Sequence, residues 1–223
     1  MTMVGVLLAG GASTRMKSPK ALAQRGRSSY MAHGIRNLWS ACTSVVAVLG
    51  ANGPAIQRAV EDEFTELVQS GALHDDLSRA HHHGADGYEV HFSRNPRWKS
   101  GMFSSVQVGL RQALALEPQG VLVLPVDHPS VKSKTIATLA EMLGQALAAS
   151  APKERARFAY AIVPRHRGRR GHPLALSPAL AQAIAKDREA ANLDDAVRRN
   201  ARLVGYLDVA DAGILRNVNR PGD

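Results

Sequence analysis

The chain has little of several features that mark particular classes of protein. Cys42 is its only cysteine, which excludes an internal disulfide and a zinc site built from several thiolates. Aromatic residues make up 4% and do not alternate with lysine and arginine, as they would in a platform that stacks single-stranded nucleic acid. No apolar run approaches the roughly 18 residues of a membrane span. We therefore expect neither a nucleic acid nor a membrane as partner.

The N-terminal residues also lack the features of a secretory leader. Met1 leads directly into apolar residues, with no basic stretch before them and no small-residue cleavage site after them. A single cysteine fits a reducing compartment. Together these features predict a cytoplasmic protein.

Positive charge, by contrast, is abundant. The formal net charge is +9, while hydrophobic residues make up 45% and charged residues 21%, an ordinary globular balance. Such a charge indicates an anionic partner without separating a nucleotide from other anions.

Short apolar runs alternate with longer amphipathic stretches. This alternation predicts an α/β fold, with a Rossmann-like, mostly parallel twisted sheet and helices on both of its faces. We expect strands at residues 4–9, 45–49, 88–93, 120–125 and 159–164. We expect helices at residues 29–41, 54–66, 104–116 and 133–149. We take residues 1–223 as one domain, and expect ligands at the carboxyl ends of the strands.

Residues 71–87 interrupt this alternation and are expected to form an exposed insertion. They include His81, His82 and His83, three adjacent histidines that could bind a transition metal. A solvent-exposed loop is the more ordinary interpretation of such a tract.

A glycine-rich stretch follows the first predicted strand and has the composition of a phosphate-binding loop. The residues we expect to contact phosphates are Leu8, Ala9, Gly10, Gly11, Ser13, Arg15 and Lys20. Small residues let backbone N–H groups approach a phosphate chain, and the two cations can neutralise its charge. The spacing fits neither a Walker A loop nor the dinucleotide-binding G-x-G-x-x-G motif. A tight turn with two surface cations is the alternative interpretation.

The order Leu-Ala-Gly-Gly, Arg15-Met16 and Lys20 resembles the glycine loop of the nucleotidyltransferases that include the molybdenum-cofactor guanylyl- and cytidylyltransferases. The resemblance implies a sheet of the nucleotide-diphospho-sugar transferase type, an NTP substrate, Mg²⁺ and a phosphorylated acceptor of the molybdopterin type. It also implies that the loop wraps the triphosphate and that Lys20 contacts phosphate. Lys17 stands where the family usually has glycine.

An aspartate ends the fourth predicted strand. Asp127 follows the apolar run at 120–126 and precedes Pro129 by two residues. Its carboxylate could hold Mg²⁺ together with water and phosphate oxygens. An Asx turn before the proline is the structural alternative. The family has an aspartate-containing loop at this point, which favours the metal ligand; His128 stands where relatives usually have Met or Gln, and we assign it no catalytic role.

The segment at residues 95–106 resembles the cytidylyltransferase-like branch, with its Asn-Pro-x-Trp-x-x-Gly-Met-x-Ser-Ser sequence. The resemblance implies that Asn95, Gly101, Ser104 and Ser105 contact the nucleotide. We expect Ser104 to cap the following helix, whose first N–H groups can hold an anion or a ribose. An ordinary capped helix would explain the two serines but not the whole segment.

Two further segments follow the last predicted strand. The first, Gly-Arg-Arg-Gly-His-Pro at 168–173, resembles the acceptor-side loop of the same branch, so that Arg169, Arg170 and His172 could bind an acceptor phosphate. A solvated basic turn is the alternative. The second, at 217–223, resembles the closing motif of the family, from which Asn219 would supply a second metal contact. Arg220 and Gly222 depart from that motif, and an asparagine is a weaker ligand than an aspartate.

The sequence therefore predicts a Mg²⁺-dependent nucleotidyltransferase with Arg15, Lys20 and Asp127 as catalytic residues. It would move the nucleoside monophosphate of an NTP to a phosphorylated acceptor and release pyrophosphate. CTP is favoured by the two segments of the cytidylyltransferase-like branch, and GTP by the closing Asn-x-Asn. The rival hypotheses are a non-catalytic nucleotide-binding protein, such as a cofactor carrier or a partner of a molybdoenzyme, and a sugar-phosphate nucleotidyltransferase or related glycosyltransferase.

Overall fold

Strands and helices alternate along most of the chain. The computed structural model describes residues 1–11, 19–71, 89–151 and 157–218. Its strands are β1 (Met3–Ala9), β2 (Gln24–Arg25), β3 (Ser28–Ser29), β4 (Ser44–Leu49), β5 (Glu89–Arg94), β6 (Gly120–Pro125), β7 (Tyr160–His166), β8 (Arg169–Arg170), β9 (Leu174–Leu176) and β10 (Leu203–Asp208). Its α-helices are α1 (Tyr30–Trp39), α2 (Gly53–Gln69), α4 (Met102–Leu114), α5 (Ser133–Ala148), α7 (Pro178–Lys186) and α8 (Leu193–Asn200). Short 3₁₀ helices are η1 (Lys20–Leu22), η2 (Trp98–Ser100) and η3 (Ala212–Leu215).

The main sheet has the strand order β10-β7-β9-β6-β1-β4-β5, and β8 pairs with β7. β1 lies between β6 and β4 and is parallel to both, β4 is parallel to β5, and β10 is parallel to β7. β9 is antiparallel to both of its neighbours, β6 and β7. β2 and β3 form a separate antiparallel hairpin. The carboxyl ends of β1, β6 and β4 consequently meet at one edge of the sheet.

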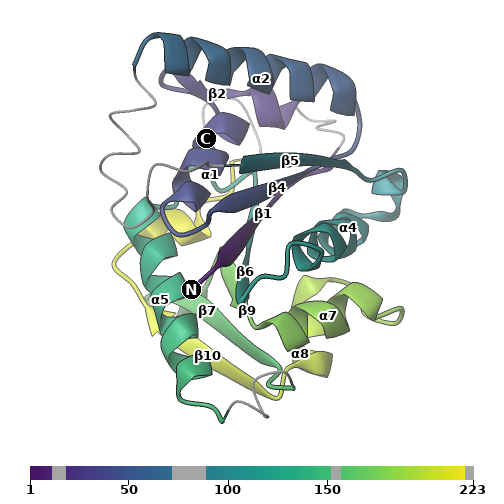
Figure 1. Ribbon diagram of the computed structural model, residues 1–223, viewed down its shortest axis with the longest axis vertical. Coiled ribbons are helices and arrows are strands. Elements are labelled where there is room, and N and C mark those ends of the chain that lie inside the picture. Colours follow the sequence, from purple (N-terminus) through teal and green to yellow (C-terminus); the bar gives the residue numbers. More distant parts are fainter. Residues whose placement is uncertain (12–18, 72–88, 152–156, 219–223) are drawn as a thin grey trace.

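Helices cover both faces of this sheet (Figure 1). Side chains of β1 alternate between two cores: Leu7 packs in a cluster with Ile35 of α1 and Leu139 of α5. Val6 packs on the other face in a cluster with Val106 of α4. Burial on both faces explains why the central strands are continuous apolar runs. The predicted α/β class, with a mostly parallel sheet and helices on both faces, is confirmed.

The five predicted strands and four predicted helices are all present, with ends that differ by a few residues. Ser29 caps α1, because its hydroxyl accepts a hydrogen bond from the N–H of Ala32 at 3.1 Å. The sequence patterns did not identify β9, α7, α8 and β10. Ser177 begins α7 and is fully buried: it accepts from the N–H groups of Leu180 and Tyr160 and donates to the carbonyl of Phe158.

The predicted insertion at residues 71–87 lies outside the described residues beyond Gly71, and so do the three histidines. In the described part of the chain, no helix is long and apolar enough to cross a membrane.

Candidate active site

The end of β1 packs closely against its neighbours. A side chain at Gly10 would place its Cβ 2.4 Å from the hydroxyl of Ser105 on α4. A Cβ at Gly50, just after β4, would lie 2.0 Å from the carbonyl oxygen of Gly10. A Cβ at Gly11 would meet none of the described residues within 4 Å. Glycine is therefore required at position 10 by packing, whereas no described residue fills the space beside Gly11.

Lys20 and Asp127 lie together at this edge of the sheet. Lys20 begins η1, and its Nζ lies 3.4 Å from Oδ2 of Asp127. The two side chains are 17% and 20% exposed. Asp127 follows β6, whose neighbour is β1, and its backbone carbonyl accepts from the N–H of Val218 at 2.8 Å. The pairing of β1 with β6 thus brings the predicted lysine and aspartate into direct contact.

The second carboxylate oxygen of Asp127, Oδ1, is buried and has no hydrogen-bond partner among the described residues. No hydrogen bond of an Asx turn involves this side chain in that part of the chain. A buried acceptor without a donor is costly, unless a cation or a water occupies the space beside it. In the described ranges no cluster of three His, Cys, Asp or Glu residues could hold a metal. One hard carboxylate nevertheless fits Mg²⁺, which is commonly held by one or two carboxylates together with water and substrate phosphates.

Two histidine rings lie next to Asp127. Nε2 of His128 is 3.8 Å from Oδ1 of Asp127, and the ring centroids of His128 and His172 are 4.8 Å apart. Burial lowers the pKa of His128, although the Asp127 carboxylate opposes this effect. Burial, followed by the charge of His128, lowers the pKa of His172 to about 4. His172 is therefore neutral near pH 7 and can contact an anion through a hydrogen bond but not through a charge.

A cavity of about 810 Å³ opens beside these residues. It reaches the ends of β1 and β6 at Leu8 and Pro125, and its wall includes His128. All three residues predicted to bind the acceptor line it, namely Arg169, Arg170 and His172. Arg170 also forms an ion pair with Asp194 at 3.2 Å, in which both side chains are more than half exposed. Solvent screens such a pair strongly, so that an incoming phosphate can compete for the arginine.

The opposite wall of the cavity comes from α4, α8, β10 and the end of η3. Its lining residues include Met102, Val106, Asn192, Val197, Arg198, Val204, Tyr206, Leu215 and Asn217. Apolar side chains predominate among these residues, with the aromatic ring of Tyr206 and with arginines nearby. Such a surface suits a ligand that combines a ring with a phosphate group.

The polar groups of the 95–105 segment bond mainly to one another. The amide nitrogen of Asn95 donates to the hydroxyls of Ser104 and Ser105 at 2.8 and 2.9 Å, and its oxygen accepts from the N–H of Arg97. Ser104 in turn lies within donating distance of the carbonyls of Gly101 and Arg97. These hydrogen bonds fix the conformation of the loop at residues 95–101 and keep Ser105 in contact with Gly10.

The prediction that Ser104 caps the helix is wrong. α4 begins at Met102, and Gly101 is its N-cap, with φ of 100° and no side-chain cap bond. Ser104 already lies within the first turn and bonds back to the loop. A positive φ favours glycine, which accounts for Gly101 as a conformational requirement.

Three predicted site residues, Ser13, Arg15 and Asn219, lie outside the described residues, as does Lys17. Of the others, Leu8, Lys20, Asp127, Arg169, Arg170 and His172 gather around one cavity and the crevice at its edge. Asn95 and Ser104 are set back from it and bond to each other.

Comparison with known proteins identifies the family. A model of the MobA-like NTP transferase domain matches residues 5–203. The chain belongs to this family. As a MobA-like NTP transferase it is a nucleotidyltransferase that uses an NTP, as its sequence predicted. No curated protein matches the chain.

Solved structures show the same fold at low sequence identity. Rv0371c from Mycobacterium tuberculosis H37Rv superimposes with a TM-score of 0.69 at 18% identity, covering 99% of this chain and 95% of that chain. The same protein in complex with manganese gives a TM-score of 0.58 at 19% identity, covering 94% and 89% of the two chains. Molybdopterin-guanine dinucleotide biosynthesis protein A from Archaeoglobus fulgidus gives 0.52 at 16%, covering 99% and 93%. The 2-C-methyl-D-erythritol 4-phosphate cytidylyltransferase from Thermus thermophilus gives 0.58 at 16%, covering 97% and 92%.

Sequence reasoning missed the wall of the cavity formed by α8 and β10. Asn192 and Tyr206 carry no motif that separates them from ordinary surface residues, whereas Asn217 belongs to the closing segment that the sequence had singled out. They reach the cavity because α7 returns the chain to the carboxyl edge of the sheet and β10 then pairs with β7. Only the tertiary arrangement reveals them.

Proposed function

We propose that this MobA-like NTP transferase moves the nucleoside monophosphate of an NTP, with CTP favoured over GTP, to a phosphorylated acceptor of the molybdopterin type. Mg²⁺ is the metal, and Asp127 is its ligand in the protein. The observation that carries the proposal is the contact between Lys20 and Asp127 at 3.4 Å, with Oδ1 of Asp127 buried and without a donor among the described residues, beside the glycine loop. The M. tuberculosis relative that was crystallised with manganese supports a divalent cation in this family.

The reaction is a displacement at the α-phosphorus. A phosphate oxygen of the acceptor attacks this atom in line, the bond to the oxygen that bridges the α- and β-phosphates breaks, and pyrophosphate leaves with the bonding electrons. The attacking oxygen is already anionic near pH 7, so that no general base or covalent intermediate is required. Catalysis then rests on the position of the reactants and on charge stabilisation.

Several residues of the chain would contribute to binding the triphosphate and to stabilising its charge. Gly10 and Gly11 bring backbone N–H groups close to the triphosphate, and Lys20 and Arg15 stabilise the charge that develops on the transferred and leaving groups. When bound, Mg²⁺ supplies Lewis-acid stabilisation of the phosphate oxygens. Asp127 would hold the cation, and Lys20 donates to the Oδ2 oxygen of that carboxylate. Asn219, which lies outside the described residues, would be the second metal contact.

The cavity takes the acceptor. Arg169 and Arg170 bind its phosphate by charge, and neutral His172 contributes a hydrogen bond. Tyr206 and Met102 offer apolar surface to a ring system. The cavity reaches His128, the neighbour of Asp127, which supports an acceptor phosphate bound next to the α-phosphate.

The test is pyrophosphate release with each of the four NTPs in the presence of Mg²⁺ and molybdopterin. We expect release with CTP to exceed release with the other three nucleotides. Absence of pyrophosphate with every nucleotide would overturn the molybdopterin acceptor. Tight nucleotide binding by calorimetry without any turnover would select the non-catalytic carrier, which the asparagines of the closing segment favour.

A further inference from the structure

A second hollow lies on the other side of the first turns of α4. Its volume is about 570 Å³, and it shares no lining residue with the cavity described above. Its walls are the loop before α4, the exposed side of α4 itself, and the chain from the end of α7 to Ala190. Three separate elements thus surround one space.

The charge around this hollow is strongly positive. Four cations line it, namely Arg97, Arg111, Lys186 and Arg188, together with one acid, Asp187. Arg111 has a structural role, because it donates to the carbonyl of Ala185 at 3.1 Å. Lys186 lies in the last turn of α7, where its charge complements the helix dipole. Arg97 and Arg188 are exposed, and within the described residues neither guanidinium forms an ion pair. Two cations of the described chain therefore face the hollow without an acidic partner.

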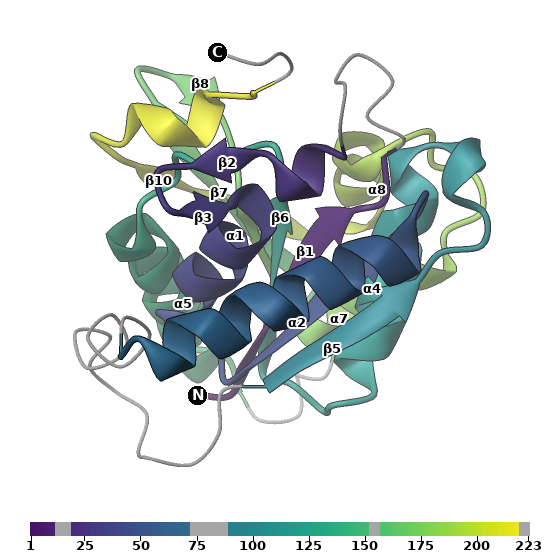
Figure 2. The same cartoon turned by 90° about the horizontal axis from the view of Figure 1, so that it is seen from above.

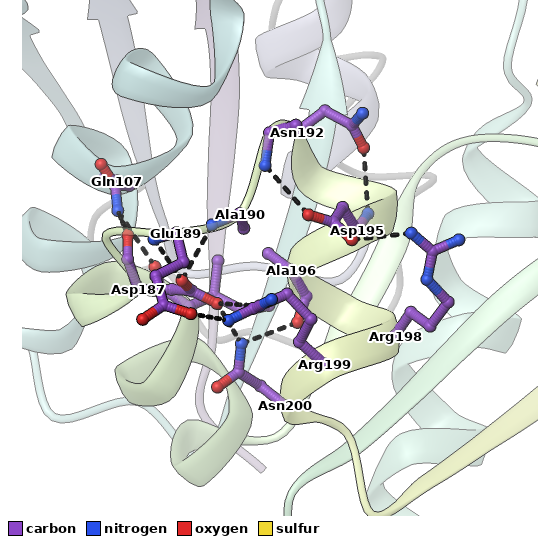
Figure 3. Close-up of polar contacts among 12 residues, drawn as sticks. Gln107, Asp187, Glu189, Ala190, Asn192, Asp195, Ala196, Arg198, Arg199 and Asn200 are labelled. Carbon is purple, nitrogen blue, oxygen red and sulfur yellow. Dashed lines mark hydrogen bonds and ion pairs between the residues drawn. The ribbon is translucent and has the colours of Figure 1, made fainter.

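The neighbouring acids do not neutralise these cations. Asp187 accepts from the N–H of Glu189 and from the amide of Asn200, and its carboxylate lies 3.5 Å from Arg199. The Glu189 carboxylate pairs with Arg199 as well. Figure 3 shows both acids engaged with α8. The hydrogen bonds from Glu189 and Asn200 hold the pKa of Asp187 below its usual value, so that it stays ionised and committed to that network.

The wall formed by the end of α7 is fixed in place. Nε2 of Gln107 donates to the carbonyl of Asp187 at 2.6 Å and lies 3.3 Å from that of Ile184. With Arg111, it satisfies carbonyls that would otherwise repel an anion at the end of this helix. The bonds between α4 and the end of α7, visible in part in Figure 3, give a hollow with a defined shape.

We infer that this hollow binds the phosphate group of a small molecule, at a site distinct from the nucleotidyl-transfer crevice. Guanidinium groups approaching from two elements suit the tetrahedral geometry of a phosphate better than a single point charge would. A single compact space with one aromatic side chain, Phe103, is unlike the long groove and stacking platform that a nucleic acid requires. The inference does not depend on the acceptor or base assigned above.

Occupation of the hollow would also reach the transfer site. The backbone of Arg97 is bonded to Asn95 and Ser104, and Asn95 bonds to Ser105, which packs against Gly10. A ligand that orders Arg97 therefore acts on the loop that borders the nucleotide. This chain of contacts gives a phosphate-bearing effector a physical route to the reaction centre.

The test uses inorganic phosphate as the probe, at constant ionic strength, with backbone amide shifts recorded on the ¹⁵N-labelled full chain. We expect saturable shifts at Arg97 and at residues 185–190. Arg97→Gln combined with Arg188→Gln should weaken this binding about tenfold or more, since the variant lacks two exposed, charged hydrogen-bond donors. The matched control combines Arg58→Gln with Lys134→Gln, two exposed cations on α2 and α5, and should bind as the wild type does.

Several outcomes would overturn the inference. Equal weakening in both double variants would mean that only net charge matters. Shifts confined to Gly10, Gly11 and Asp127, or displacement of phosphate from residues 185–190 by CTP, would assign the phosphate to the transfer crevice. Tight binding of a short single-stranded oligonucleotide that the Arg97 and Arg188 changes abolish would mark a nucleic-acid surface. Thermal melting of both double variants checks that they fold, and a failure to release pyrophosphate in the turnover assay would leave this binding result unaffected.

Discussion

Asp127→Asn separates what this carboxylate contributes to folding from what it contributes to reaction. The substitution keeps the shape of the side chain and removes the charge that lies 3.4 Å from the Lys20 ammonium. Because the two side chains are only 20% and 17% exposed, solvent screens the pair little, but the cost of keeping the Asp127 charge out of water offsets much of the attraction. Loss of the pair should lower the free energy of unfolding by about 1 kcal/mol. Urea denaturation of the variant measures that difference.

The effect of Asp127→Asn on turnover should be much larger. Loss of the metal-binding oxygen should lower kcat/KM for pyrophosphate release with CTP about a hundredfold or more, which corresponds to about 2.7 kcal/mol of transition-state stabilisation. Lys20→Met should lower it by a similar factor, and the double variant should lose less than the product, because the two groups act on the same phosphates.

The control is Asp62→Asn, which removes an equal charge from an exposed position on α2. It should leave both stability and turnover unchanged. Residual activity of Asp127→Asn should rise as Mg²⁺ is increased, since the defect lies in holding the cation. Near-normal kcat/KM in Asp127→Asn at ordinary Mg²⁺ would refute the assignment of the site.

Three further predictions concern stability. Gly10→Ala should cost about 1–3 kcal/mol in urea denaturation, because its Cβ would lie 2.4 Å from the Ser105 hydroxyl, and adding Ser105→Ala should recover part of the loss. Gly11→Ala, whose Cβ would have none of the described residues within 4 Å, should cost far less, and an equal cost at the two positions would contradict this packing. Burial, with the charges of two nearby arginines, lowers the pKa of His33 to about 4 from 6.5, so the unfolded chain takes up the proton first. Stability should therefore fall as the pH drops from about 6.5 to 4 and should fall less steeply in His33→Gln; parallel curves of unfolding free energy against pH would disprove the burial effect. Ser177→Ala should cost about 1–2 kcal/mol or more through loss of the α7 cap and of a buried hydroxyl, and a change in melting temperature within error would contradict it.

The sequence was sufficient for the central part of the fold. Residues 4–9, 45–49 and 120–125 are apolar at almost every position because both faces of their strands are buried, and a run of that kind cannot be a surface segment. Periodicity did not identify β9, because a strand of three residues is too short to show an alternating pattern. Its antiparallel direction was not predictable either, because it depends on the strands with which β9 pairs. β10 lies at the edge of the sheet with Leu203 and Tyr206 exposed, so that it lacks the continuous apolar pattern of the central strands.

The part of the site that was predictable consists of charged residues that directly follow the end of a strand. Lys20 and Asp127 were expected in one crevice because residues that follow parallel strands lie at the same edge of a sheet. The structure adds that β1 and β6 are direct neighbours, which brings the two side chains into contact. The sequence could not show that the amide of Asn95 would donate its hydrogen bonds to Ser104 and Ser105. A residue type fixes how many hydrogen bonds a side chain can make, but not which groups it bonds to. The starting point of α4 was missed by two residues for a related reason: the N-cap conformation at Gly101 needs a positive φ and not a hydroxyl.

The reversed direction of β9 has an electrostatic consequence for the whole ligand-binding edge. A parallel strand in its place would deliver the amino end of the next helix to this edge, with a partial positive charge and free N–H groups. Because β9 runs the other way, α7 arrives with its carbonyl end instead. Gln107 and Arg111 of α4, the helix that lies against α7 (Figure 2), occupy that end. At the end of α7, arginine and lysine side chains therefore supply the positive charge that a helix amino terminus would otherwise provide. Single substitutions can add or remove such side chains without altering the fold.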